Sequence, residues 1–183
     1  MEPHDLYNLP PGLPVPGDDG AADHLQGLEL PHLVLDSSNG PVDLASFSVL
    51  YVYPRTGKPG EPSLPGWDAI PGARGCTPQS CAFRDHAADL AQLGATVAGL
   101  SAQSLADQCE FAERNHIPYP VICDSSLALR DVLGLPTFEV AGHTLYKRLA
   151  LVARDGRIEK VFYPVFPPDR NAADVVAWLR DRR

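Results

Sequence analysis

Two cysteines in the stretch GARGCTPQSC are the residues of this chain best suited to nucleophilic or redox chemistry. Cys76 follows a long loop and precedes a helical pattern, in which Thr77 is the expected N-cap and Pro78 suits the first turn. The free N–H groups and the dipole at a helix start stabilise a thiolate, which is the nucleophilic form of cysteine. We therefore predict that Cys76 is the attacking group.

The spacing between Cys76 and Cys81 predicts a bond that forms and breaks. Five residues of intact helix separate two Cα atoms by about 8.7 Å, whereas a disulfide needs less than about 7 Å. The two thiols can therefore join only if the first helical turns unwind. A structural disulfide would not be built this way, but a bond made during a reaction cycle can be.

Other interpretations of the four cysteines stay open. A zinc site with His86 is disfavoured because structural zinc sites use closer cysteine pairs, so we expect no metal. Cys76 and Cys81 can also be two unrelated buried thiols. Cys109 on an apolar helix face and Cys123 in a strand have no activating context, and we expect both to be buried packing residues.

The composition predicts one globular domain with an extended lead-in. Of 183 residues, 44% are hydrophobic and 21% are charged, and residues 1–54 carry eight acids but no Lys or Arg. Because no basic stripe occurs, we expect neither nucleic acid nor a membrane as a partner. The start of the chain has no signal-like pattern and no run of 18 apolar residues occurs, so a cytoplasmic location is expected. In a reducing compartment, cysteines are commonly buried packing residues, metal ligands or redox catalysts.

The Pro/Gly-rich residues 1–25 are predicted to be extended and poorly ordered, outside the core of a domain spanning 26–183. In that domain the pattern predicts a hairpin around Asn39-Gly40 and a buried strand at 47–54. The later elements expected are a helix at 77–94, a strand at 95–102, a helix opening at Ser104 with Asp107 at the capping-box position, a strand at 119–123, a helix at 125–134, a hairpin over 144–164 and a final helix with Ala172, Val175, Val176 and Leu179 inward.

This order predicts an α/β fold of the thioredoxin-like type, in which a central mixed sheet is flanked by helices and preceded by an N-terminal β-hairpin. The segment 55–75, with nine Pro or Gly among 21 residues, is expected to be an inserted loop. Loops of this length are usually functional or disordered. Trp67 and Ile70 favour a loop that packs down as a lid, and a mobile loop is the alternative.

Five segments resemble the Q-type peroxiredoxins, also called the bacterioferritin comigratory protein branch: VLYVYP, GCTPQSCAFRD, VAGLSAQS, FAERNHIPYPVICD and KRLALVARDGRI. The resemblance runs from about Leu30 to the C-terminus. It implies a thiol peroxidase without a cofactor, in which Cys76 attacks hydrogen peroxide or organic hydroperoxides and becomes a sulfenic acid. Cys81 would resolve it as an intrachain disulfide, which thioredoxin or a similar dithiol protein would reduce. The relatives of this branch are commonly monomers.

The resemblance also assigns supporting residues. Arg148 falls at the position of the family's arginine, where a guanidinium would stabilise the thiolate and the departing oxygen. The alternative is a solvated charge beside Lys147. Arg84 is either a site residue or a surface salt-bridge partner, while Pro54 corresponds to the proline that shields the cysteine from water.

The chain departs from the family motif Pro-x3-Thr-x2-Cys at two positions. Ala73 stands where the motif has Thr, and Pro54 lies 22 residues before Cys76 instead of seven. Thr56 or Thr77 could supply the missing hydroxyl. Two further functions therefore stay open: a general thiol-disulfide oxidoreductase, which lacks the expected CxxC, and a peroxide-sensing or binding module with a degenerate site.

Overall fold

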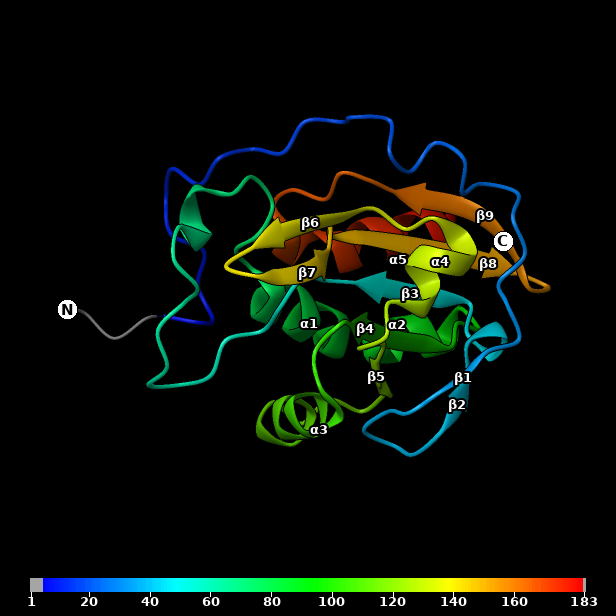
Figure 1. Cartoon of the computed structure of the whole chain (residues 1–183). Coiled ribbons are helices and arrows are strands. Elements are labelled where there is room, and N and C mark those ends of the chain that lie inside the picture. Colours follow the sequence, from blue (N-terminus) through cyan, green and yellow to red (C-terminus); the bar gives the residue numbers. More distant parts are fainter. Residues whose placement is uncertain (1–4, 183) are drawn as a thin grey trace.

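The computed structural model describes residues 5–182 and places a five-stranded mixed sheet at its centre (Figure 1). In spatial order the strands are β5 (Val121–Cys123), β4 (Val97–Ser101), β3 (Val49–Val52), β8 (Leu149–Arg154) and β9 (Arg157–Phe162). The first three strands are parallel, and β8 runs antiparallel to both β3 and β9. The predicted thioredoxin-like α/β fold with a mixed sheet is confirmed.

The central strand β3 is buried on both faces. Val49 and Tyr51 point into one core cluster, and Leu50 and Val52 point into the other, as the two-residue period of a strand requires. A strand covered on both faces is expected to be a continuous apolar run, as this one is.

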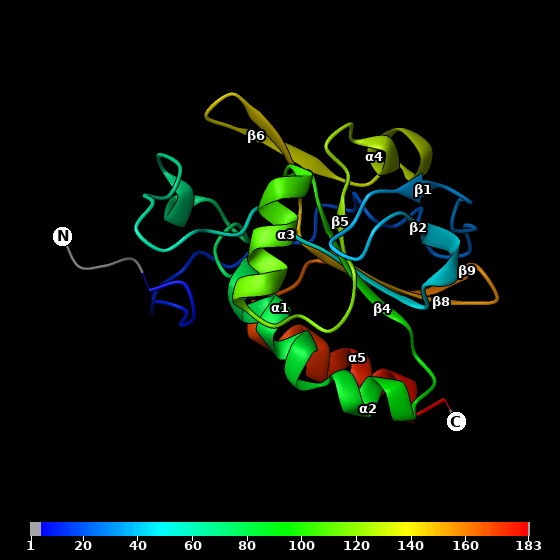
Figure 2. The ribbon, with the colours of Figure 1, turned by 90° about the horizontal axis from the view of Figure 1, so that it is seen from below.

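Helices cover the two faces unequally (Figure 2). Residues of α1 (Cys76–Asp85), α2 (Ala87–Gln92), α3 (Leu105–Arg114) and α5 (Asn171–Arg180) belong to the core cluster on one face. The other face is covered by α4 (Ala128–Leu133) and by the N-terminal segment. Within the part of the chain described, no helix is long and apolar enough to cross a membrane.

Two small hairpins complete the fold. The antiparallel pair β1 (Val34–Leu35) and β2 (Val42–Asp43) confirms the N-terminal hairpin. A second pair, β6 (Thr137–Val140) and β7 (His143–Tyr146), was not expected, because residues 144–154 were predicted to be one strand. That prediction is wrong: β7 ends before Lys147, whose N–H bonds the carbonyl of Pro136, and Arg148 turns its side chain inward.

The predicted helix 77–94 is divided, and its start is shifted. α1 ends before His86 and α2 follows it, while α1 begins at Cys76 rather than Thr77. The N-cap is Gly75, whose φ of 112° suits glycine. A Cβ at this position would lie 2.7 Å from Cγ of Pro168, so only glycine fits. Thr77 is thus inside the first turn and is not the cap.

α3 confirms one expectation and overturns another. Ser104 caps it by accepting a hydrogen bond from the N–H of Asp107, as predicted. Cys109, however, is exposed, because the buried side of α3 carries Gln108 and Phe111 instead. Sequence hydropathy does not identify that side, since a buried glutamine forms part of it.

The N-terminal segment belongs to the core, contrary to the prediction for residues 1–25. Ala22 and Leu25 are buried in the cluster that also contains α4. Further toward the N-terminus, Leu6 lies against Gly57 and Leu9 lies against Gly75, so the segment touches both ends of the inserted loop. Residues 1–4 lie outside the described part, and the domain boundary at residue 26 stays a prediction.

The inserted loop 55–75 packs down, as Trp67 and Ile70 predicted. A short 3-10 turn, Trp67–Ala69, buries the indole against Ala73, Val140 and Leu145, with Ile70 at the edge of the cluster. The loop therefore rests on the β6–β7 hairpin.

Replacing Leu25 by alanine should lower the free energy of unfolding by about 2–5 kcal/mol, because a fully buried leucine leaves a cavity. Leu28→Ala is the matched control, since Leu28 is 38% exposed and should cost less than about 1 kcal/mol. Urea unfolding followed by circular dichroism measures both. Equal losses would show that the N-terminal segment does not belong to the cooperative core.

Candidate active site

Cys76 is the first residue of α1, and its thiol is buried. Nη2 of Arg148 donates to its Sγ at 3.2 Å, and Sγ itself lies 3.7 Å from the carbonyl oxygen of Ala73. A cation and the positive end of a helix thus face the same sulfur. Both stabilise negative charge there.

Arg148 is 4% exposed, so the alternative of a solvated strand-end charge is wrong. Its Nη2 also donates to the carbonyl of Ala73 at 2.9 Å, with longer bonds to those of Gly72 and Arg74. Nη1 donates to Oε1 of Gln79 at 2.6 Å. The guanidinium is therefore held between α1 and the end of the inserted loop.

Gln79 is fully buried and is held in turn by α5. Its Nε2 donates to Oδ1 of Asn171 at 3.0 Å, and Asn171 is also buried. Sequence reasoning missed both residues. A polar residue three positions after Cys76 was the signal available for Gln79, whereas Asn171 gives no signal before α5 is placed.

A pocket opens at Cys76, between the inserted loop, the N-terminal segment and the start of α3. Its lining residues are Leu6, Arg55, Thr56, Gly57, Lys58, Glu61, Pro62, Ser63, Leu64, Trp67, Arg74, Gly75, Cys76, Thr77, Gln103 and Asp107. Thr56 and Thr77, the two candidates for the missing hydroxyl, thus share the pocket with Cys76. Ala73 is not among these residues and packs beside Trp67 instead.

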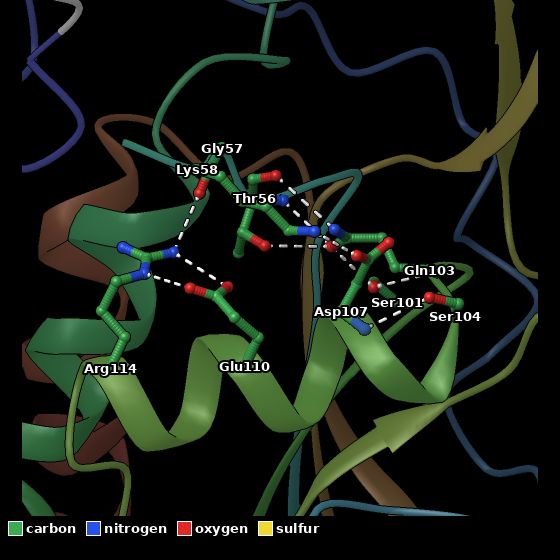
Figure 3. Close-up of polar contacts among 9 residues, drawn as sticks. All are labelled: Thr56, Gly57, Lys58, Ser101, Gln103, Ser104, Asp107, Glu110 and Arg114. Carbon is green, nitrogen blue, oxygen red and sulfur yellow. Dashed lines mark hydrogen bonds and ion pairs between the residues drawn. The ribbon is translucent and has the colours of Figure 1, made fainter. Parts of the chain in front are cut away.

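Polar contacts hold residues 57 and 58, at the start of the inserted loop, against α3 (Figure 3). Nζ of Lys58 lies 2.7 Å from Oδ1 of Asp107, which raises the pKa of Lys58 and lowers that of Asp107. Arg114 donates to the carbonyl of Gly57 at 3.1 Å and pairs with Glu110 at 2.7 Å. The first residues of the inserted loop are therefore fixed beside the pocket.

Cys81 lies apart from this pocket, on the intact helix α1. Its Sγ is 3.9 Å from Oδ1 of Asn115, and burial raises the pKa of its thiol. The positive charge of Arg84 opposes that rise only partly. Cys81 is thus kept in the protonated form, which is the less nucleophilic one.

The remaining predicted residues do not line the pocket. Arg84 donates to the carbonyl of Asn115 and pairs with Asp85, so it belongs to the surroundings of Cys81. Pro54 is buried directly after β3 but does not line the pocket. Cys109 is exposed on α3 and Cys123 is half-buried in β5.

Known proteins resemble this chain along most of its length. The Redoxin family model matches residues 25–177. Chloroplastic peroxiredoxin Q of Sedum lineare is 25% identical over 154 residues, 82% of this chain and 74% of that protein. The corresponding protein of Arabidopsis thaliana is 26% identical over 160 residues, 85% of this chain and 67% of that protein.

Solved structures agree. Peroxidoxin BcpB of Mycobacterium tuberculosis superposes with a TM-score of 0.69 at 26% identity, covering 86% of this chain and 97% of the other. Peroxiredoxin Q of Xanthomonas campestris has the same fold, with a TM-score of 0.65 at 22% identity over 84% of this chain and 96% of the other.

The fold is thioredoxin-like, and its site is a buried thiol at a helix start faced by a buried arginine. This combination defines a thiol peroxidase of the peroxiredoxin type. The chain belongs to the Redoxin family, and the relatives it resembles are peroxiredoxins of the Q type.

Arg148→Met should lower the second-order rate constant of Cys76 with hydrogen peroxide by about 100-fold, because it removes the cation that faces the sulfur. Stopped-flow measurement of thiol loss gives this constant. Arg154→Met, at the far end of β8 with an exposed side chain, is the matched control and should keep the wild-type rate. A wild-type rate in Arg148→Met would show that the guanidinium only packs.

Alkylation of Cys81 should require a higher pH than alkylation of a cysteine in an unfolded peptide. Burial raises the pKa of this thiol, so less thiolate is present at any given pH. Iodoacetamide labelling of Cys81 in a Cys76→Ser variant, followed by mass spectrometry across pH, locates the midpoint. A midpoint at or below that of the peptide would contradict the assignment.

Proposed function

We propose that the chain is a thioredoxin-dependent peroxidase that reduces hydrogen peroxide or organic hydroperoxides through Cys76 and Cys81. The observation that carries this proposal is the 3.2 Å contact between Nη2 of Arg148 and Sγ of Cys76, a residue that lines a pocket. The names of the relatives support the reaction class.

In the first step, the thiolate of Cys76 attacks the terminal oxygen of the hydroperoxide. The S–O bond forms as the O–O bond breaks, so the sulfur is oxidised to a sulfenic acid and the departing alkoxide or hydroxide takes up a proton. Arg148 stabilises negative charge on the sulfur and on the departing oxygen. Its contacts to Gln79 and to three backbone carbonyls keep it in place.

In the second step, the thiol of Cys81 condenses with the sulfenic acid, which forms a disulfide and releases water. Because both cysteines lie on the intact helix α1, that helix must unwind first. Unwinding separates Gln79 from Arg148, so the oxidised site loses the arrangement that favours attack. Thioredoxin or a similar dithiol then reduces the disulfide by exchange, and α1 forms again.

A peroxide-sensing module is the second candidate, because Ala73 leaves the motif position without a hydroxyl. Rapid turnover with a dithiol reductant would distinguish the peroxidase from it. The expectations of a monomer and of a cytoplasmic location stay predictions.

One equivalent of hydrogen peroxide should produce a 76–81 disulfide, which peptide mapping by mass spectrometry detects. With thioredoxin, its reductase and NADPH, peroxide should drive NADPH consumption, and Cys76→Ser should abolish it. Cys109→Ser is the control, since Cys109 is exposed on α3 and is not among the residues that line the pocket. Turnover that survives Cys76→Ser, or a bond from Cys76 to Cys109 or Cys123, would contradict the proposed cycle.

A further inference from the structure

A hydroperoxide in the Cys76 pocket needs a hydrogen-bond acceptor. Its terminal oxygen carries a proton. For attack on that oxygen, the sulfur and the two peroxide oxygens must lie close to one line. The side chain nearest the sulfur, Arg148, can only donate, and the nearby carbonyl of Ala73 already accepts from Arg148. An acceptor that fixes the peroxide O–H would hold the reacting atoms in line.

Thr56 has the features of such an acceptor. It is 5% exposed and lines the pocket that contains Cys76. Its hydroxyl donates to Oε1 of Gln103 at 3.2 Å, and its backbone N–H donates to the same atom at 3.0 Å. Because its own proton is engaged, the lone pairs of Oγ1 are left to accept from a ligand.

The orientation of the Gln103 side chain is set by a backbone group. The N–H of Thr56 can only donate, so the amide atom facing it must be the oxygen. The amide nitrogen then points to the carbonyl of Thr56, at 3.5 Å. With the amide in this orientation, the threonine hydroxyl has to donate to Gln103.

A chain of buried hydrogen bonds leads from Gln103 into the core, and Figure 3 shows its first part, from Thr56 through Gln103 to Ser101. Ser101, fully buried, donates to Oε1 of Gln103 at 3.1 Å, and it accepts from Nε2 of Gln108 at 2.9 Å. Nε2 of Gln108 also donates to the carbonyl of Ile122, which fixes that amide too. Tyr53 then donates to Oε1 of Gln108 at 2.9 Å, so every proton in the chain is assigned.

We propose that Thr56, held by Gln103, is the catalytic hydroxyl that accepts the hydroperoxide O–H while Cys76 attacks. This inference rests on the proposed peroxidase function. Thr56 contacts the substrate in this assignment, whereas Gln103 is a positioning residue. As the S–O bond forms, the proton held by Thr56 stays on the transferred oxygen and becomes the proton of the sulfenic acid. The inserted loop thus supplies, from its first residues, a group that Ala73 cannot provide.

The test compares two reactions of the same thiol in the full-length protein. Thr56→Val should lower the rate constant of Cys76 with hydrogen peroxide by about 10- to 100-fold. Its rate with iodoacetamide, which needs no acceptor for a peroxide proton, should stay within about threefold of wild type. Thr56→Ser should restore the peroxide rate, and Thr144→Val on β7, a matched loss of a remote hydroxyl, should leave both rates unchanged.

Three outcomes would overturn this inference and leave the proposed function standing. The first is a wild-type peroxide rate in Thr56→Val, and the second is an equal loss of the peroxide and iodoacetamide rates in Thr56→Val, which marks a structural effect. The third is a loss of peroxide reactivity in Thr77→Val with no loss in Thr56→Val. A wild-type rate no faster than that of free cysteine would overturn the proposed function and this inference together.

Discussion

The buried guanidinium of Arg148 is the contact on which the site depends. Burying a cation is costly unless hydrogen bonds and opposite charge compensate it. Its hydrogen bonds go to Gln79, to the carbonyls of residues 72–74 and to the sulfur of Cys76. The ion pairs found among residues 5–182 do not include Arg148. Of the groups that accept a hydrogen bond from Arg148, only the sulfur of Cys76 can carry a negative charge, and this contact joins the end of the inserted loop to the start of α1.

The inserted loop is held at both ends and in the middle. At its start, Thr56 is bound to Gln103, just before α3, and Lys58 is bound to Asp107 in the first turn of α3. At its end, Arg148 binds the carbonyls of residues 72–74, and Arg74 pairs with Asp68 inside the loop. Trp67 packs its centre onto the β6–β7 hairpin. These hydrogen bonds, ion pairs and apolar contacts together hold the inserted loop in place beside the pocket, although the loop itself has little regular structure.

The parts predicted correctly from the sequence are those with local signals. The apolar run of β3, the Ser104 cap of α3 and the position of Cys76 at a helix start each depend on a few neighbouring residues. The errors arise from contacts distant in sequence. Leu25 is core because other segments cover it, and the strand predicted over 144–154 is interrupted where Arg148 turns toward α1. Gln79, Gln103 and Asn171 were missed because a buried amide resembles a surface one until its partners are placed.

The first described residues of the chain lie at the pocket, although Cys76 is about 70 residues further along the sequence. Leu6 lines the pocket, and the carbonyl of Asp5 accepts a hydrogen bond from Arg74 at 2.6 Å. The helix α5 ends on the far side of the molecule (Figures 1 and 2). An affinity tag joined directly before Asp5 would therefore lie beside the pocket, whereas one joined directly after α5 would be remote from it. Kinetic comparisons between preparations of this protein are meaningful only when the N-terminal end is the same.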